Sequence, residues 1–200
     1  TGVSLPKEKP AIPQKNEQVS AITTNPDGSW KWESQLENSQ NNFSEFYFID
    51  GNSDDIQSDS KKNGLFSIIK PLSFVLKKTV ADLQVEVKLD LSEFNGDVSI
   101  LHHYQSMEHY DFLEISPGKI TLGRVENGKR NEMDSKNLQV DGWITLKAIG
   151  SGRHFKGYLD EKLVVHGHAP AFDSGSVGLW VNGTGTLGLI SIETIILKHN

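Results

Sequence analysis

Apolar and polar residues alternate along much of the chain, most clearly between residues 141 and 181. One run sets two groups of side chains on opposite faces: Trp143, Thr145, Lys147 and Ile149 against Ile144, Leu146 and Ala148. A period of two residues is typical of a half-buried β-strand. Turn residues at 150–152 and 160–161 separate this strand from the runs at 154–159 and 162–166. The stretch therefore predicts consecutive antiparallel hairpins.

The same pattern extends over most of the remaining sequence. Further β-rich runs lie at residues 65–69, 73–77, 83–91, 98–104, 109–116, 119–126 and 187–197. Turn signals such as Asn95-Gly96-Asp97 and Asn127-Gly128 separate them. No segment predicts a helix of any length. The sequence predicts an all-β chain that folds as a two-sheet antiparallel β-sandwich.

The first 25 residues differ from the rest in composition. Pro6, Pro10 and Pro13 stand among charged residues, and large apolar side chains are few. Such a segment buries too little to offset the entropy lost on ordering. We therefore expect a flexible tether over residues 1–25 and one sandwich domain over residues 26–200, with an ordinary loose terminus as the alternative for the first segment.

Composition narrows the classes of partner. The formal net charge is −6, the pI is about 5.6, and no lysine- or arginine-rich run stands out, so no nucleic acid partner is expected. The absence of cysteine excludes a disulfide framework and a thiolate metal site. The longest apolar run falls well short of the roughly 20 residues of a membrane helix, so no transmembrane segment is expected.

Three phrases of the sequence resemble a known family. They read W-x-x-L-K at 143–147, Y-L-D-x-K-x-V at 158–164 and S-G-x-V-G-L-W at 174–180. In this order they resemble the concanavalin A-like (laminin G-like) jelly-roll domains of secreted bacterial proteins, which are related to glucanase, lectin and sugar-ketone hydrolase sandwiches. The resemblance covers roughly residues 64–197. It implies a concanavalin A-like jelly roll that is secreted, periplasmic or tethered at the cell surface, and many activities occur on that fold.

Trp180 is the main candidate for contact with a ligand. It alternates with three apolar strand neighbours, which are Val177, Leu179 and Val181. An indole on the concave side of a jelly roll is a natural stacking surface for the apolar face of a sugar ring, while nearby polar side chains bind hydroxyl groups. The polar residues expected beside it are Tyr110, His103 and Arg124. A polysaccharide or glycan is the predicted partner, and a tryptophan buried in the core is the alternative.

The hairpin over residues 98–116 is a candidate metal site. If it turns at residues 106–107, His102 faces Asp111 and His109 lies on the same face. Two imidazoles and a carboxylate suit zinc, copper or nickel. The alternative is an ordinary polar end of a sheet, since a slip of one residue separates the three side chains.

Two weaker metal signals lie elsewhere. Residues 50–55 read Asp-Gly-Asn-Ser-Asp-Asp, which spaces oxygen ligands two apart as in a calcium loop. The pattern departs from a complete loop at Asp55 and Lys61, where glycine and glutamate are expected, so calcium competes with a solvated acidic loop. His166 and His168 lie two residues apart on one strand face and form half of a possible site.

Catalysis is not clearly encoded. The laminarinase-type relatives place acids at alternating positions of one strand, whereas here Asp111 falls on the opposite face from Glu108 and Glu114. No nucleophile elbow, phosphate-binding glycine loop or His-Glu-x-x-His motif occurs. The sequence predicts a non-catalytic carbohydrate-binding module of an exported bacterial protein. The alternatives are a glycoside hydrolase-like enzyme using Glu108, Glu114 or Asp111, and a protein-binding surface module; no feature predicts the oligomeric state.

Overall fold

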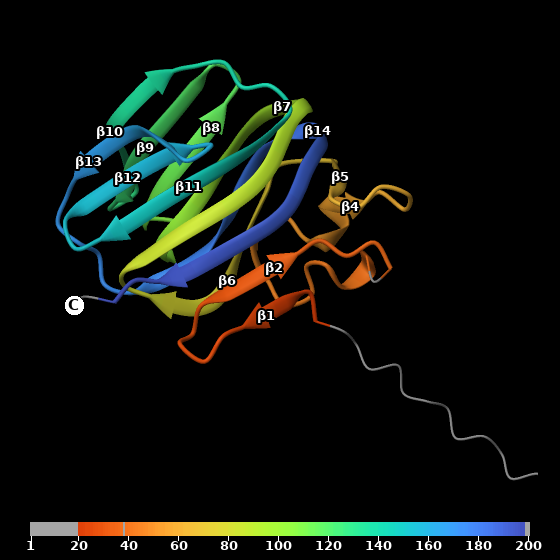
Figure 1. Cartoon of the computed structure of the whole chain (residues 1–200), viewed down its shortest axis with the longest axis horizontal. Helices are drawn as coiled ribbons and strands as arrows, with labels where there is room; N and C mark the ends of the chain where they lie inside the picture. The colour runs from red at the N-terminus through yellow and green to blue at the C-terminus, as the bar shows by residue number, and fades with distance from the viewer. Residues whose placement is uncertain (1–19, 38, 199–200) are drawn as a thin grey trace, which may run out of the picture.

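The computed structural model describes residues 20–37 and 39–198, which form 14 strands and two short 3-10 helices (Figure 1). The strands are β1 (Ile22–Thr24), β2 (Trp30–Glu33), β3 (Tyr47–Asp50), β4 (Ile56–Ser58), β5 (Leu65–Ile68), β6 (Leu72–Val80), β7 (Leu83–Ser106), β8 (His109–Ser116), β9 (Lys119–Glu126), β10 (Lys129–Asn137), β11 (Trp143–Ser151), β12 (His154–Leu159), β13 (Lys162–His168) and β14 (Gly175–Ile196). The helices are η1 (Ser39–Asn41) and η2 (Ser53–Asp55). The predicted all-β class is confirmed. Neither helix of the described part is long and apolar enough to cross a membrane.

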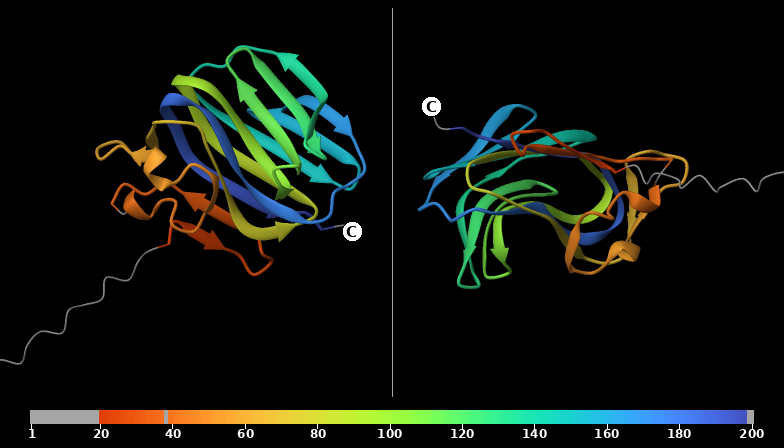
Figure 2. Two further views of the ribbon diagram at one scale, coloured as in Figure 1. Left: turned by 180° about the vertical axis from the view of Figure 1, so that it is seen from behind. Right: turned by 90° about the horizontal axis from the view of Figure 1, so that it is seen from below.

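Two antiparallel sheets pack face to face, as the right panel of Figure 2 shows edge-on. The sheet that faces the viewer in the left panel of Figure 2, called here the front sheet, has the order β3-β6-β14-β7-β8-β9-β10. The back sheet has the order β1-β2-β14-β7-β11-β12-β13. β7 and β14 belong to both sheets: β7 pairs with β11 over residues 83–90 and with β8 over its second half. The sandwich is therefore built around two long strands that bend from one layer into the other.

The bend occurs where the two paired strands carry facing glycines, Gly96 of β7 and Gly183 of β14. A Cβ atom on Gly96 would lie 2.2 Å from the carbonyl oxygen of Asn182, and one on Gly183 would lie 2.3 Å from that of Asn95. No side chain fits at either distance, so the close approach of the two backbones requires glycine at both positions. The turn residues predicted here thus bend two continuous strands rather than end them.

The interior between the sheets is apolar. In β7, alternate side chains are completely buried, namely Leu83, Val85, Val87 and Leu89. At the other end of the sandwich, Trp30 and Trp32 of β2 are 1% and 0% exposed, and Phe43 and Phe46 pack against Phe74 with ring centroids 5.2 and 4.9 Å away. The alternation of apolar and polar residues in the sequence therefore correctly predicts which strand side chains form the core.

The sandwich begins before the domain boundary expected at residue 26. β1 pairs with β2 through Ile22 and Trp32, and Ala21 is only 6% exposed. Residues 21–24 thus supply an edge strand of the back sheet instead of ending a tether. The rest of the expected tether, residues 1–19, lies outside the described residues.

Candidate functional site

The outer face of the front sheet carries a second apolar layer, separate from the core. Its buried members are Val75, Leu101, Tyr110, Phe112 and Val125, and Ile49, Tyr104 and Trp180 pack against them. Trp180 is half-buried, while its strand neighbours Leu179 and Val181 are completely buried between the sheets. Trp180 therefore projects outward from the sandwich, because successive side chains of a strand point to opposite faces.

A cleft of about 340 Å³ opens on this outer face. The outer-face cleft is lined by Asp97, Ser99, Tyr110, Glu114, Arg130, Trp180 and Asn182. These residues come from neighbouring strands, since Trp180 pairs with Ser99 across β14 and β7, and Ser99 pairs with Glu114 across β7 and β8. The regular pairing of the sheet thus places an indole, a phenol, two carboxylates and a guanidinium around one depression.

The polar side chains of the cleft hold one another in place. Glu114 Oε2 accepts a hydrogen bond from Ser99 Oγ at 3.2 Å, and Glu114 Oε1 lies 2.9 Å from Nη2 of Arg130. The Arg130 guanidinium also lies 3.8 Å from the centroid of the Phe112 ring. Ion pairing and stacking together orient the guanidinium before any ligand arrives, which lowers the entropy lost on binding.

A second polar pair lies across the cleft. Nδ2 of Asn182 donates to Oδ2 of Asp97 at 2.8 Å. Burial raises the pKa of the Tyr110 phenol, so this side chain stays protonated and keeps its hydrogen-bond donor at neutral pH. The cleft therefore combines a flat apolar surface with oriented donors and acceptors, the combination that suits a ring bearing hydroxyl groups.

The structure brings together two of the four residues predicted to contact a ligand. Trp180 and Tyr110 line the same cleft, whereas His103 and Arg124 are 2% and 5% exposed and lie inside the sandwich. Strict alternation would place His103 on the outer face with Leu101. A β-bulge between His102 and Ser106 and a positive φ of 49° at His103 turn this ring inward instead.

A buried polar network lies between the sheets and consists of His102, His103, Asp111 and Arg124. The network is centred on Asp111, whose Oδ1 accepts from Nε of Arg124 at 2.7 Å and whose Oδ2 lies 2.9 Å from Nδ1 of His103. Nδ1 of His102 lies 3.1 Å from the same His103 nitrogen, and His103 Nε2 contacts the carbonyl oxygen of Ala81. Burial lowers the pKa of His102 to about 3, so this ring is neutral. Burial opposes ionisation of Asp111, but its hydrogen bonds to His103 and Arg124 hold its pKa below the usual value.

This network changes the composition of the predicted metal group. His102 faces Asp111 as expected, but the hairpin turns at residues 107–108 instead of 106–107. His109 therefore pairs with Ser106, and its ring centroid lies 6.1 Å from that of Phe172. His103 takes the place of His109, and the donor atoms of His102, His103 and Asp111 lie within 4.8 Å of one another. A cation among them would meet the Arg124 guanidinium, which already binds both carboxylate oxygens of Asp111. The geometry favours an ion-pair network among His102, His103 and Asp111, while metal binding by the predicted set of His102, His109 and Asp111 stays a prediction.

The predicted calcium loop directs its oxygens toward its own backbone. Asp50 Oδ1 accepts from the amide of Gly51 at 2.9 Å, and Asn52 Oδ1 accepts from that of Asp54 at 2.8 Å. Asp55 Oδ2 accepts from the Asn52 amide and pairs with Lys70 Nζ at 3.4 Å. The contacts of Asn52 and Asp55 form a capping box at the start of η2. This role explains why acidic and amide side chains recur at this spacing without a bound ion.

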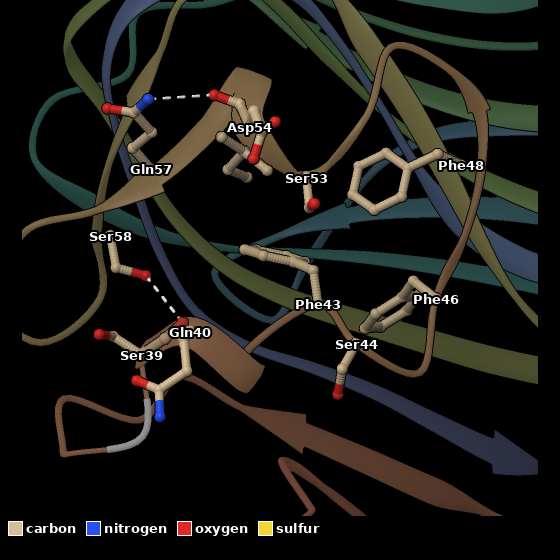
Figure 3. Close-up of a pocket in the computed structure, with 11 residues that line it drawn as sticks. Ser39, Gln40, Phe43, Ser44, Phe46, Phe48, Ser53, Asp54, Gln57 and Ser58 are labelled. Carbon is tan, nitrogen blue, oxygen red and sulfur yellow. Dashed lines mark hydrogen bonds between the residues drawn. The ribbon is translucent and has the colours of Figure 1, made fainter.

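A larger cavity of about 580 Å³ lies at the N-terminal end of the sandwich, among residues 39–58 (Figure 3). Figure 3 shows Phe43, Phe46 and Phe48 on one side of it, facing the polar side chains of Ser53, Asp54, Gln57 and Ser58. The rings of Phe43, Phe46 and Phe48 all pack on Phe74 of β6. Because these rings are part of the apolar packing, and Asp54 is the one charged residue in the lining, we favour the outer-face cleft as the functional site.

Sequence reasoning missed part of the cleft. Ser99, Asp97 and Asn182 were predicted only as strand or turn residues, and Arg130 lies in β10, which was not predicted. The Asn127-Gly128 turn was the available signal for β10, because a type I′ hairpin continues into a second strand. Pairing β10 with β9 would have placed Arg130 opposite Val125 and beside the outer layer.

Comparison with known proteins supports the fold. No family model matches the chain, and no curated protein matches it in sequence. Among solved structures, carbohydrate-binding module CBM66 from Bacillus subtilis has a TM-score of 0.60 and 16% identity, over 73% of this chain and 92% of that one. A Bacillus subtilis protein of unknown function with a galectin-like fold has a TM-score of 0.61 and 9% identity, over 76% and 90%. Bacillus licheniformis β-glucanase has a TM-score of 0.51 and 13% identity, over 89% and 83%.

These similarities confirm the concanavalin A-like jelly roll predicted from the sequence. Structures with this arrangement of strands include a carbohydrate-binding module and a glucanase, so the fold is one that sugar-binding proteins and hydrolases share. At sequence identities of 16% or less, the structural similarity establishes the fold alone. The function has to be argued from the residues of the site.

Proposed function

We propose that this protein binds carbohydrate without cleaving it, through the outer-face cleft of the front sheet. The observation that carries the proposal is Trp180, which is half-buried outside the core and lines a cleft with oriented polar side chains. A core tryptophan of this chain looks different, since Trp30 and Trp32 are 1% and 0% exposed.

In the proposed complex, one face of a sugar ring stacks on the Trp180 indole. The C–H groups of the ring contact the indole, and the hydroxyl groups at its edge meet acceptors on Asp97 and donors on Arg130 and Asn182. Because Arg130 is held by Glu114 and Phe112, it contributes hydrogen bonds at a low entropic cost. This arrangement favours a pyranose or furanose with several free hydroxyl groups.

A glycoside hydrolase is the second candidate, because two carboxylates, Asp97 and Glu114, line the same cleft. Two observations favour binding over hydrolysis. Glu114 already pairs with Ser99 and Arg130, and Asp97 with Asn182, so both acids are engaged by neighbouring side chains. Of the other acids considered, Asp111 is buried and Glu108 lies in the exposed turn between β7 and β8.

We propose further that the protein is bacterial and exported from the cell. The support for this is the proline-rich composition of the first 25 residues and the resemblance of the strand phrases to secreted jelly-roll domains. A protein-binding surface module would use the same outer face, and the experiment below separates the two partners.

The test compares two tryptophans outside the core. Trp180→Ala is expected to weaken retention on a polysaccharide panel roughly 10-fold or more, because it removes the stacking surface. Trp143→Ala is the matched control, since Trp143 is 41% exposed but lines a different depression, with Asp90 and Thr186. Both variants should keep the circular dichroism spectrum of the parent.

The outcomes distinguish the candidate functions. Retention that depends on Trp180, with no release of reducing sugar, supports a binding module. Release of sugar that stops in Glu114→Gln or Asp97→Asn supports an enzyme. If Trp180→Ala binds every glycan that the parent binds, or if no glycan is retained by the parent, the proposed carbohydrate site is wrong and a protein partner becomes the leading candidate.

A further inference from the structure

Three histidines gather on the outer face of the back sheet, away from the outer-face cleft. His154 of β12 lies directly opposite His168 of β13, and His166 stands two residues before His168 on the same face. The ring centroid of His168 lies 4.7 Å from that of His154 and 4.5 Å from that of His166. Their donor nitrogens all lie within 4.8 Å of one another, and all three residues are exposed.

A β-bulge brings the third histidine to this face. The turn at Asp160-Glu161 pairs Leu159 with Lys162, and regular pairing from there would set His154 opposite Gly167. The register shifts by one residue between Gly157 and Tyr158, so His154 pairs with His168 instead. Since a one-residue shift moves a side chain to the opposite face, the bulge is what unites His154 with the other two imidazoles.

The three rings are available to a ligand. Within residues 20–37 and 39–198, no side-chain hydrogen bond or ion pair engages their nitrogens. Two charged groups lie beside the cluster: Lys156 is opposite His166, and Oδ2 of Asp134 in β10 accepts from the His166 backbone amide at 2.9 Å.

We propose that His154, His166 and His168 bind one divalent transition-metal ion of the type that imidazoles prefer, such as Zn²⁺, Ni²⁺ or Cu²⁺. Three imidazole nitrogens match the softness of these ions, whereas calcium and magnesium require oxygen ligands. Zinc bonds to histidine nitrogens at about 2.0–2.1 Å, which sets tetrahedral ligand atoms roughly 3.4 Å apart. The exposed rings reach this spacing by rotating about their side-chain bonds, because neither packing nor hydrogen bonds fix them.

The geometry has two consequences. Three protein ligands leave a coordination position for water or for a donor from another molecule, as in open zinc sites. The ion would also join β12 to β13, the last strand of the back sheet, and so stabilise that edge. This site is on the opposite sheet from Trp180, so its test does not depend on the proposed carbohydrate binding.

The experiment titrates the full chain with Zn²⁺ by isothermal calorimetry and with Co²⁺ by visible absorption. We expect one ion per chain, with the intense d–d bands of a tetrahedral cobalt centre. His154→Ala, His166→Ala and His168→Ala should each weaken binding roughly 10-fold or more, because each removes one ligand. The matched control is His109→Ala, which removes a half-buried imidazole outside the cluster.

Three outcomes would overturn the proposal. One is the absence of binding at metal concentrations up to about 100 μM, a weak limit for a site with three imidazoles. Another is binding that survives all three substitutions, which places the ion elsewhere. The last is an equal loss in His109→Ala, which shows that single imidazoles over the whole surface account for the signal.

Discussion

In the described part of the chain, two clusters of histidine bring their donor atoms equally close together but lie in opposite environments. In each, the donor atoms lie within 4.8 Å of one another. His102 and His103 are 0% and 2% exposed and lie beside Asp111 and Arg124, whereas His154, His166 and His168 are exposed. Proximity of ligand atoms is therefore a poor guide by itself to metal binding.

The difference lies in which lone pairs are free and which charges surround them. In the buried cluster, Asp111 binds the Arg124 guanidinium through both oxygens, and His103 contacts acceptors with both ring nitrogens. Nε2 of His102 is buried without a hydrogen-bond partner, but the network carries the fixed positive charge of Arg124, so another cation is disfavoured there. In the exposed cluster the rings contact one another and are open to solvent, so a metal ion would compete only with water there.

The largest effect expected is from removing the carboxylate of the buried network. Asp111→Ala leaves Arg124 buried without its ion-pair partner, and breaking a buried pair in this way typically costs about 3–5 kcal/mol of folding free energy. The measurement is the urea midpoint of the variant against the parent. Glu132→Ala is the control, because it breaks an exposed pair with Lys119 and should move the midpoint little. Equal midpoints for Asp111→Ala and the parent would show that the network contributes nothing to stability.

The next largest effect expected is a loss of folding free energy in acid, which comes from the buried cluster and not from the exposed one. The pKa of His102 is lowered to about 3 by burial, so the unfolded chain takes up this proton before the folded protein does. Stability is therefore highest above about pH 6.5 and falls by roughly 1.4 kcal/mol per pH unit as the pH decreases below that value. Asp111, whose pKa is also lowered, adds to the loss below about pH 4.

Urea unfolding between pH 6.5 and 4.5 tests the contribution of His102. His102→Asn should flatten the dependence in this range, while His166→Ala should leave most of it, because the His166 ring is exposed and its proton costs little in the folded state. A parent with constant stability across this range would contradict the assignment to the buried ring.

Zinc should stabilise the protein through the exposed cluster. At free zinc of about 100 times Kd, mass action adds about 2.7 kcal/mol, which raises the Tm of a domain of this size by roughly 5–10 °C. EDTA should reverse the shift, and it should vanish below about pH 5 as the imidazoles protonate. A shift that persists in His168→Ala but disappears in Asp111→Asn would assign the ion to the buried cluster instead.

The fold could be predicted from the sequence because its strands obey simple alternation. Val177, Leu179 and Val181 are completely buried, and Trp180 between them faces outward, as the period of two requires. The pairing of His102 with Asp111 was expected from a turn at residues 106–107, whereas the hairpin turns at 107–108 and the bulge between His102 and Ser106 restores that pairing. Where the hydrogen-bonded ladder is regular, the pattern of the sequence is sufficient to assign a side chain to a face.

The parts that could not be predicted lie where the ladder is irregular. A bulge turns His103 inward, and a second bulge brings His154 beside His166 and His168. Each shift of one residue reverses the face of a side chain, and no sequence signal marked either bulge. The long strands β7 and β14 posed a similar difficulty, since a glycine at the bend of a continuous strand resembles a turn until its partner strand is known.

The smallest effect expected is that of removing an exposed imidazole in the absence of metal. His166→Ala in EDTA should change the folding free energy by no more than about 0.5 kcal/mol, because the ring is exposed and makes no hydrogen bond that the substitution would break. His102→Ala should cost several times more, since it empties a fully buried site beside Phe155 and His103. Urea midpoints for the two variants and for His109→Ala, all measured in EDTA at pH 7.5, provide the comparison. If His166→Ala is as destabilised as His102→Ala, the exposed histidines hold the sheet edge together by their own contacts, and their grouping needs no ion to account for it.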